Sequence, residues 1–430
     1  MIIDWVIDFF CSRKSFPIVL LSPLPYSLGD SAAEIYFGLL KARREGKKLY
    51  ILRPYNLEWL LKYRLTNREL YKIESDYCYT LDGNCREKLI RFALTVGYIP
   101  FRLFNLLLRK CFGMSLDESY SFPRIGIITL WQPKRSMKNF SKQVAHSFNW
   151  EEQFNSYLPV RLQSESVARA EEIRKKMGVG KEDWFVCLHV REPGFHGDFG
   201  RRESRNSSIS NYIPAIKAIT EAGGWVIRLG DNTMTPLPQM HKVIDYPFSQ
   251  FKSDLMDIYL VSECKFFVAS QSGLVEVAVL FQKPVITPNM YVWAVAYPYK
   301  SGDLGIMKHV YSRLQGRFLS IKELFENGWE AQEYCGSQSQ DFKMQENSPE
   351  EIKTLVCEYM DSMDDKEKKL TALQINASRR RTLNAYRLLE EGKMPGSHDD
   401  HKYRVAARLE CNGALGREFL EKNWERSSKN

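Results

Sequence analysis

The chain has 430 residues, of which 44% are hydrophobic and 13% aromatic, which is enough for the cores of two ordinary domains. Its 61 basic and 52 acidic side chains leave a formal charge of +9, a mild excess that suits an anionic small ligand or an anionic membrane surface. The sequence has no repeated aromatic and basic platform and no helix-turn-helix pattern, so we do not expect nucleic acid as a partner.

Three features bear on location. The first ten residues lack a basic segment and carry two aspartates, Asp4 and Asp8, which argues against a signal peptide. No apolar run reaches the ~18–20 residues that a transmembrane helix needs. The 9 cysteines form no C-x-x-C pair, and several lie in apolar segments, as reduced, buried thiols do. We therefore expect a cytoplasmic protein, either free or attached peripherally to the inner face of the membrane.

The amino-terminal half predicts a βαβ unit. Strands are expected over 16–22 and 48–53, with a helix over 31–45 between them that Asp30 would cap. Gly29 and Asp30 lie in the turn before this helix. Further helices are expected over 57–74 and 85–112, and a strand over 124–130. Residues 1–175 are therefore predicted to form a Rossmann-like domain.

Residues 97–112 are both amphipathic and basic. Packing of this segment against a protein core is the favoured interpretation of the pattern. Contact with a membrane surface is the alternative, because basic amphipathic helices also bind there.

Strands and helices alternate regularly in the second half, which predicts a second Rossmann-like domain over 176–345. The expected strands cover 184–191, 225–229, 243–246, 265–269 and 284–287, and the expected helices cover 209–221, 254–261 and 274–281. The strand over 284–287 should end the sheet. A helical segment is expected over 346–394 and a weakly ordered tail over 395–430. The predicted fold class is α/β, with two Rossmann-like domains and a cleft between them.

Two loops of the second domain have the composition of ligand-binding loops. His189 and Arg191 end its first strand, and the loop 192–206 that follows mixes glycines, arginines and acids. Glycines let the backbone approach a ligand, and guanidinium groups bind anionic oxygens. The turn 270–273 opens a helix, whose N–H groups and positive dipole end suit a pyrophosphate. Ligands of open parallel sheets bind at this edge, outside the carboxyl ends of the strands.

The segment His189-Val-Arg191 resembles the His-x-Arg element of the fucosyltransferase superfamily, in which the arginine contacts the nucleotide diphosphate. A wider pattern over roughly 180–295, about a quarter of the chain, resembles a family of bacterial glycosyltransferases linked to surface polysaccharides. Its pieces are His189-Val-Arg-Glu, Arg205-Asn206, Tyr212, Gly223-Gly-Trp-Val-Ile-Arg-Leu-Gly-Asp231, Pro236-Leu-Pro238, Ile244-Asp-Tyr246, Lys252-Ser-Asp254, Met256-Asp257 and Ser270-Gln-Ser-Gly273. The resemblance implies a GT-B-type architecture. It also implies a nucleotide-diphosphate sugar as donor, with a glycan or lipid-linked acceptor. Glu192 and Pro193 depart from the fucosyltransferase pattern, so GDP-fucose specificity does not carry over.

The candidate donor-binding residues follow from the two loops and the resemblance. They are His189, Arg191, Arg205, Asn206, Arg228, Asp254, Ser270, Gln271, Ser272 and Gly273. Structural roles are the alternatives: ion pairing for Arg191, a loop hydrogen bond for His189, helix capping for Asn206 and Asp254, and close packing for Gly273.

Sugar transfer also needs a group that accepts the proton of the acceptor hydroxyl. Asp198, Glu192 and Asp30 are the leading candidates for this base, and His196 and Glu203 are further ones. The sequence shows no Asp-x-Asp pair at a strand end and no His/Cys cluster, so it requires no metal and no cofactor beyond the nucleotide sugar itself. Arginines and helix dipoles would then neutralise the leaving diphosphate.

Two other functions fit the same pattern. A UDP-sugar 2-epimerase would interconvert free nucleotide sugars without an acceptor, and a non-catalytic module would bind glycan or nucleotide without turnover.

Overall fold

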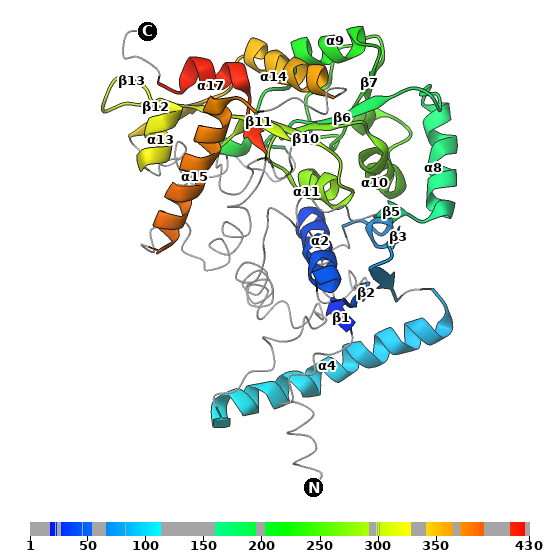
Figure 1. Ribbon diagram of the computed structural model, residues 1–430. Coiled ribbons are helices and arrows are strands. Elements are labelled where there is room, and N and C mark those ends of the chain that lie inside the picture. Colours follow the sequence, from blue (N-terminus) through cyan, green and yellow to red (C-terminus); the bar gives the residue numbers. More distant parts are fainter. Residues whose placement is uncertain are drawn as a thin grey trace.

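The fold is known from a computed structural model, which describes residues 18–21, 23, 27–44, 46–53, 66–81, 83–112, 160–194, 203–291, 298, 300, 302–327, 341–363, 370–390 and 413–425. Two parallel sheets with packed helices dominate these residues, so the predicted α/β class is confirmed. Figure 1 shows the larger sheet at the top of the view and the smaller one below it.

The larger sheet has the strand order β15-β11-β10-β9-β6-β7-β8, and its neighbouring strands all run parallel. In chain order its strands are β6 (Phe185–His189), β7 (Trp225–Arg228), β8 (Val243–Asp245), β9 (Phe267–Ala269), β10 (Val285–Met290), β11 (Leu304–Met307) and β15 (Ala414–Leu415). The central strands β6, β9, β10 and β11 are buried along their whole length. A parallel sheet that is covered on both faces requires such continuous buried runs.

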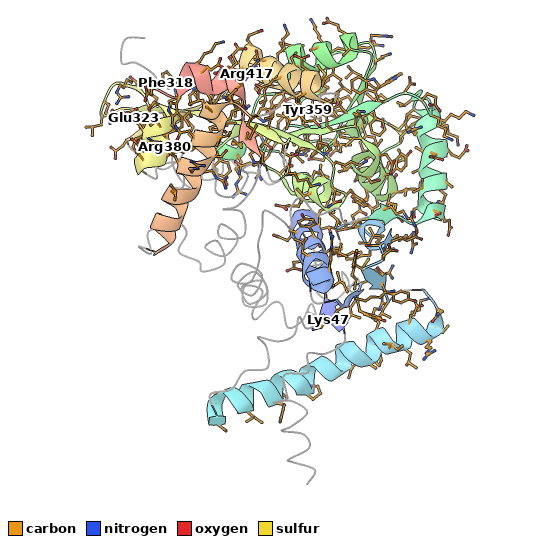
Figure 2. All side chains as sticks on the ribbon, viewed as in Figure 1. Lys47, Phe318, Glu323, Tyr359, Arg380 and Arg417 are labelled. Carbon is orange, nitrogen blue, oxygen red and sulfur yellow. The ribbon has the colours of Figure 1, made fainter. Side chains whose placement is uncertain are left out.

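Helices cover both faces of this sheet. Figure 1 shows α9 (Ile213–Glu221) and α14 (Pro349–Ser362) on one face, and α10 (Asp254–Glu263) and α11 (Gly273–Leu280) on the other. Tyr359 of α14, labelled in Figure 2, packs against Phe266 beside β9, with their ring centroids 5.0 Å apart. On the other face, α8 (Ser164–Lys176) packs against α10.

Smaller elements complete this unit. They are the antiparallel sheet of β12 (His309–Ser312), β13 (Arg317–Phe318) and β14 (Phe342–Gln345), the helices α13 (Ile321–Asn327), α15 (Ala372–Glu390) and α17 (Arg417–Asn423), and the 3-10 turns η2 (Glu203–Arg205), η3 (Ile209–Tyr212) and η4 (Tyr246–Phe248). Arg380 of α15 and Glu326 of α13 form a 2.6 Å ion pair that joins two of these helices.

The smaller sheet contains the predicted βαβ unit. Its strands β1 (Ile18–Leu21), β2 (Lys48–Ile51) and β4 (Cys78–Thr80) run parallel in the order β1-β2-β4, and α2 (Leu28–Arg44) connects the first two. The long helix α4 (Cys85–Phe112) follows β4 with the predicted bounds. The 3-10 turn η1 (Glu69–Tyr71) precedes β3 (Ile73–Glu74), which pairs antiparallel with β5 (Arg161–Leu162).

Several sequence predictions need correction. The helix expected over 57–74 does not extend over 66–74, where η1 and β3 lie; 57–65 fall outside the described residues, as does the strand expected over 124–130. Asp30 does not cap α2. The helix begins at Leu28, and Ser27 Oγ accepts the Asp30 N–H at 3.4 Å, which makes Ser27 the cap. Of the described cysteines, Cys85 and Cys111 are exposed rather than buried.

The carboxyl-terminal tail also departs from prediction. The larger sheet does not end with β10, because β11 and β15 continue it. The tail is ordered over 413–425: Leu415 and Leu420 are fully buried, and β15 pairs with β11. A two-residue strand carries too little periodicity to be recognised in a polar sequence, and its place is set by pairing with β11.

Candidate functional site

The strand order reverses direction between β6 and β9. From β6 the chain moves outward to β7 and β8, and it then returns to the opposite side of β6 with β9, β10 and β11. In open α/β sheets the crevice at such a reversal, beyond the carboxyl ends of the strands, is where ligands bind. His189 of β6 pairs here with Ala269 of β9, so the two predicted ligand loops leave the sheet side by side.

Backbone and side-chain hydrogen bonds hold these two strand ends together. The N–H of Ser270 donates to the carbonyl of His189 at 3.0 Å, and the N–H of Arg191 donates to Ser270 Oγ at 2.8 Å. Ser270 is fully buried. Its side chain therefore fixes the position of Arg191 next to the start of α11, which is a positioning role rather than the predicted contact with a donor.

The helix α11 begins without a side-chain cap, unlike α10 and α14, which serine side chains cap. Ser253 Oγ accepts the Met256 N–H in α10, and Ser348 Oγ accepts the Glu351 N–H in a capping box of α14. Ser272 is also extended, with φ −148° and ψ 167°, but it makes no capping bond, and its buried Oγ has no hydrogen-bond partner among the described residues. Because the first-turn amides of a helix have no partner inside it, this open start can receive an anion.

The unit built on the smaller sheet contacts the unit built on the larger sheet near the start of α11. Gly29, in the first turn of α2, lies so close to Gly273 that a Cβ on Gly29 would stand 2.5 Å from the Gly273 Cα. A second contact joins Asn67 Nδ2 to the backbone oxygen of Asp254 at 2.9 Å. The two helix starts α2 and α11 are therefore neighbours, and Asp30 lies one residue from the Gly29–Gly273 contact.

A short segment lies across the carboxyl ends of the central strands. The Ser207 N–H donates to the carbonyl of Arg191, and the buried Lys308, which follows β11, donates to the carbonyl of Asn206 at 2.6 Å. The Arg205 guanidinium lies over the ring of Tyr291, 5.3 Å from its centroid. This geometry gathers Arg191, Arg205 and Lys308 at one edge of the sheet. Gln271 completes it, since its Oε1 accepts the Tyr291 N–H at 2.9 Å.

His189 is a neutral group within this cluster. Burial, followed by the positive charges of Arg228 and Arg191, lowers its pKa from 6.5 to about 4. Its Nδ1 is buried and has no hydrogen-bond partner among the described residues. A neutral imidazole with an unused ring nitrogen can exchange a hydrogen bond with a ligand without adding charge.

Arg228 and Glu192 behave differently from their predicted roles. Arg228 is fully buried at the end of β7, and its guanidinium donates to Glu192 Oε1 at 2.9 Å, to Asp245 Oδ1 at 3.2 Å and to the Thr235 carbonyl at 2.6 Å. Glu192 also accepts from the Thr235 N–H and hydroxyl at 2.7 and 2.8 Å. Both side chains are occupied by this internal network, so Arg228 is not a donor-binding group here and Glu192 is poorly suited to accept a proton.

The remaining candidates lie in different parts of the chain. Asp198 and His196 lie outside the described residues, and Glu203 begins η2. Asp254 stands at the first position of α10, where Ser253 and not Asp254 is the cap. Asp30 is half-buried in the first turn of α2. Sequence reasoning missed Lys308 and Tyr291, although both directly follow strands of the parallel sheet and could have been found by inspecting every strand end.

Among the described residues, no group of three or more His, Cys, Asp and Glu side chains is placed to hold a metal ion. None of the described helices combines the length and the apolar character needed to cross a membrane.

Comparisons with known proteins give distant structural likenesses. No protein-family model matches the chain, and no curated protein sequence matches it either. Among solved structures, a family 9 glycosyltransferase from Veillonella parvula is similar over 64% of this chain and 80% of its own, with 12% identity and a TM-score of 0.34. The ADP-heptose lipopolysaccharide heptosyltransferase II of E. coli matches over 63% and 84%, with 15% identity and a TM-score of 0.31. The fucosyltransferase NodZ from Bradyrhizobium matches over 62% and 92%, with 12% identity and a TM-score of 0.32. Likeness at this distance assigns neither a reaction nor a substrate to the chain.

Proposed function

We propose that the protein is a glycosyltransferase that moves a sugar from a nucleotide-diphosphate sugar to a glycan or lipid-linked acceptor in surface polysaccharide biosynthesis. The observation that carries the proposal is the open start of α11 at the strand-order reversal, where Ser272 leaves its own helix uncapped beside Arg191 and Arg205. A helix start with nearby guanidinium groups matches the charge and the oxygen geometry of a diphosphate. In this proposal the two units form a GT-B-type pair, and the larger one holds the donor.

In the proposed reaction, negative charge develops on the leaving diphosphate. The bond between the anomeric carbon and the diphosphate oxygen breaks, and the acceptor oxygen forms the new bond to that carbon. The bonding electrons leave with the diphosphate, whose growing negative charge the α11 start, Arg191 and Arg205 stabilise without a metal. The acceptor proton passes to a carboxylate. Asp30, one residue from the Gly29–Gly273 contact, is one candidate for this carboxylate, and Asp198 remains the candidate from the loop.

Isothermal calorimetry with ADP, GDP and UDP, followed by their sugars, tests the donor site. Arg191→Ala should weaken binding of the preferred nucleotide diphosphate by roughly 1.5–3 kcal/mol, the usual scale of a charge-assisted contact, and leave the fold intact. Arg169→Ala is the matched control, because Arg169 is exposed on α8 and the variant removes the same charge. Equal affinities of wild type and Arg191→Ala would remove Arg191 from the site.

Turnover assays separate transfer from the other two functions. A transferase releases nucleotide diphosphate faster when acceptor glycan is added, and it should keep its activity in excess EDTA if no divalent ion takes part. Interconversion of free nucleotide sugars without acceptor would instead identify an epimerase. Tight binding with no turnover under any acceptor condition would identify a binding module.

A further inference from the structure

The helix α4 carries an exposed apolar surface that the proposed reaction does not use. Seven of the thirteen exposed large hydrophobic side chains among the described residues belong to it: Leu89, Ile90, Phe92, Val96, Leu103, Phe104 and Leu107. Leu89, Leu103 and Leu107 are 66%, 62% and 59% exposed. Isolated exposed apolar residues are ordinary, but a continuous patch marks an interaction surface. The core packing predicted for 97–112 is therefore wrong for Leu103, Phe104 and Leu107.

Six of these seven side chains, all except Ile90, form one stripe along the helix. At about 100° per residue, Leu89, Phe92, Val96, Leu103, Phe104 and Leu107 all project within an arc of roughly 120°. The exposed Pro100 and Cys111 lie in the same arc. The 28 residues of α4 give the stripe a helix roughly 42 Å long at 1.5 Å per residue.

Hydrogen bonds fix the start of α4 against the end of β4. Asn84 Oδ1 accepts the Glu87 N–H at 2.9 Å, and the Glu87 carboxylate accepts from the Gly83 N–H at 2.6 Å and from the Tyr79 hydroxyl of β4. Figure 1 shows α4 at the lower end of the view, with the smaller sheet and α2 between it and the larger sheet. The helix therefore lies on the side of the smaller sheet that is away from the larger sheet and its donor site.

The charge of α4 selects among partners. Its sequence has six basic residues, Arg86, Lys88, Arg91, Arg102, Arg109 and Lys110, against the single acid Glu87, a difference of five. Arg86, Lys88 and Lys110 are exposed, whereas Glu87 is engaged at the helix start. An apolar stripe flanked by exposed cations is complementary to an anionic lipid surface, where the stripe enters the acyl boundary and the cations meet the headgroups.

We propose that α4 docks the protein on an anionic membrane surface, lying in the plane of the interface with its stripe buried among the lipids. A second copy of this chain is disfavoured as the occupant, because pairing two α4 helices would bring together two sets of excess positive charge. This docking goes beyond the proposed sugar transfer. It would hold the donor site near acceptors that are themselves anchored in lipid.

Vesicle flotation of the full-length protein tests the proposal without any nucleotide, so its outcome is independent of the transferase assignment. Wild type should bind vesicles of phosphatidylcholine mixed with phosphatidylglycerol, and binding should weaken in high salt and on pure phosphatidylcholine. The double variant Leu103→Glu and Leu107→Glu should bind at least about tenfold more weakly, since it places carboxylates in the stripe. The double variant Arg86→Glu and Lys88→Glu should lose about fivefold or more for each residue changed.

Leu314→Glu is the matched control, because Leu314 is 86% exposed on the other unit and its replacement should leave vesicle binding unchanged. Circular dichroism and thermal unfolding confirm that each variant is folded. Failure of wild type to bind anionic vesicles, or equal binding by the stripe variants, overturns the proposal. A stable dimer in sedimentation that the stripe variants dissociate, with no vesicle binding, overturns it in favour of a second copy.

Discussion

On the β7 side of strand β6, the Arg228 guanidinium lies between Glu192 and Asp245 and donates to both carboxylates and to the carbonyl of Thr235. On the β9 side of the same strand, Ser272 does not cap the helix α11, and Nδ1 of the adjacent His189 has no hydrogen-bond partner among the described residues. Both clusters lie at the carboxyl edge of one sheet and both combine arginines with small polar residues. In the first cluster both terminal guanidinium nitrogens of Arg228 donate to protein groups, whereas in the second Ser272 Oγ and His189 Nδ1 have no hydrogen-bond partner among the described residues.

The two clusters therefore contribute to different properties, the first to stability and the second to ligand binding. A buried cation that is bonded to two carboxylates and a carbonyl joins the segments at the ends of β6, β7 and β8, and removing either carboxylate leaves a buried guanidinium N–H without its partner. Groups without internal partners contribute little to folding, but they can bond a ligand without breaking existing interactions. We therefore assign the β7 side to the framework of the site and the β9 side to the donor.

The largest expected effect comes from removing Glu192 from the cluster around Arg228. Glu192→Ala leaves the fully buried Arg228 with Asp245 as its remaining carboxylate partner, and it should lower the free energy of unfolding by about 3–5 kcal/mol. Urea denaturation measures this loss, and Glu182→Ala, at an exposed turn position, is the control. A variant that stays as stable as wild type but loses turnover would restore Glu192 as the catalytic base and contradict its structural role.

His189 lies between the two clusters. Protonation of its imidazole should make the free energy of unfolding depend on pH. Because its pKa is lowered to about 4 in the folded protein from 6.5, the unfolded chain binds a proton first as the pH falls. The stability contributed by the neutral ring is thus complete above pH 6.5 and is lost between pH 6.5 and about pH 4. The total is about 3 kcal/mol from the size of the shift.

Urea denaturation of His189→Gln across this pH range measures that contribution. The variant should lose about 3 kcal/mol less than wild type on acidification. His241→Gln is the control, because His241 is exposed in a turn. Parallel pH profiles for wild type and His189→Gln would show that the ring is not held neutral by its surroundings.

A serine precedes both α14 and α11, so the same substitution, serine to alanine, tests the comparison at both helix starts. Ser348→Ala removes one half of a capping box and should cost about 1 kcal/mol of stability without changing donor affinity. Ser272→Ala removes no capping bond, so stability should change by less than about 0.5 kcal/mol, whereas donor affinity should fall by about 0.5–1.5 kcal/mol. Thermal unfolding and calorimetry on both variants measure the two quantities. A loss of stability in Ser272→Ala equal to that in Ser348→Ala would mean that the α11 start is an ordinary cap.

Much of the fold could be predicted, because the apolar runs of the central strands and the periodicity of α4 are local signals. The helix 85–112 was predicted with the bounds that the structure shows. The edge strand β15 could not be predicted, since two residues acquire strand geometry only by pairing with β11. The exposure of α4 could not be predicted either, because an amphipathic pattern is the same whether its apolar face meets a core or a lipid surface.

The sequence predicted which strand ends carry the candidate residues, but not what each side chain there contacts. Arg191 and Arg228 both lie at the ends of apolar strands, and local sequence does not distinguish them. What separates their roles is the partner set of Arg228, which lies 36 residues before it at Glu192 and 17 residues after it at Asp245. Such pairings depend on how β6, β7 and β8 align in the sheet, and that alignment is a tertiary property.

The smallest expected effect concerns Tyr291, whose ring positions Arg205 on the β9 side of strand β6. Its guanidinium lies over the Tyr291 ring, and Tyr291 is fixed in turn by its backbone bond to Gln271. Tyr291→Leu removes the aromatic face and should weaken nucleotide-diphosphate binding by about 0.5–1 kcal/mol, the scale of a partly exposed cation–π contact. Tyr291→Phe keeps the ring and should bind like wild type, which separates the aromatic face from the hydroxyl. If calorimetry gives equal affinities for the leucine and phenylalanine variants, stacking does not prepare Arg205 for the ligand. The donor would then be held by Arg191 and the α11 start alone, and Arg205→Ala should be equally silent.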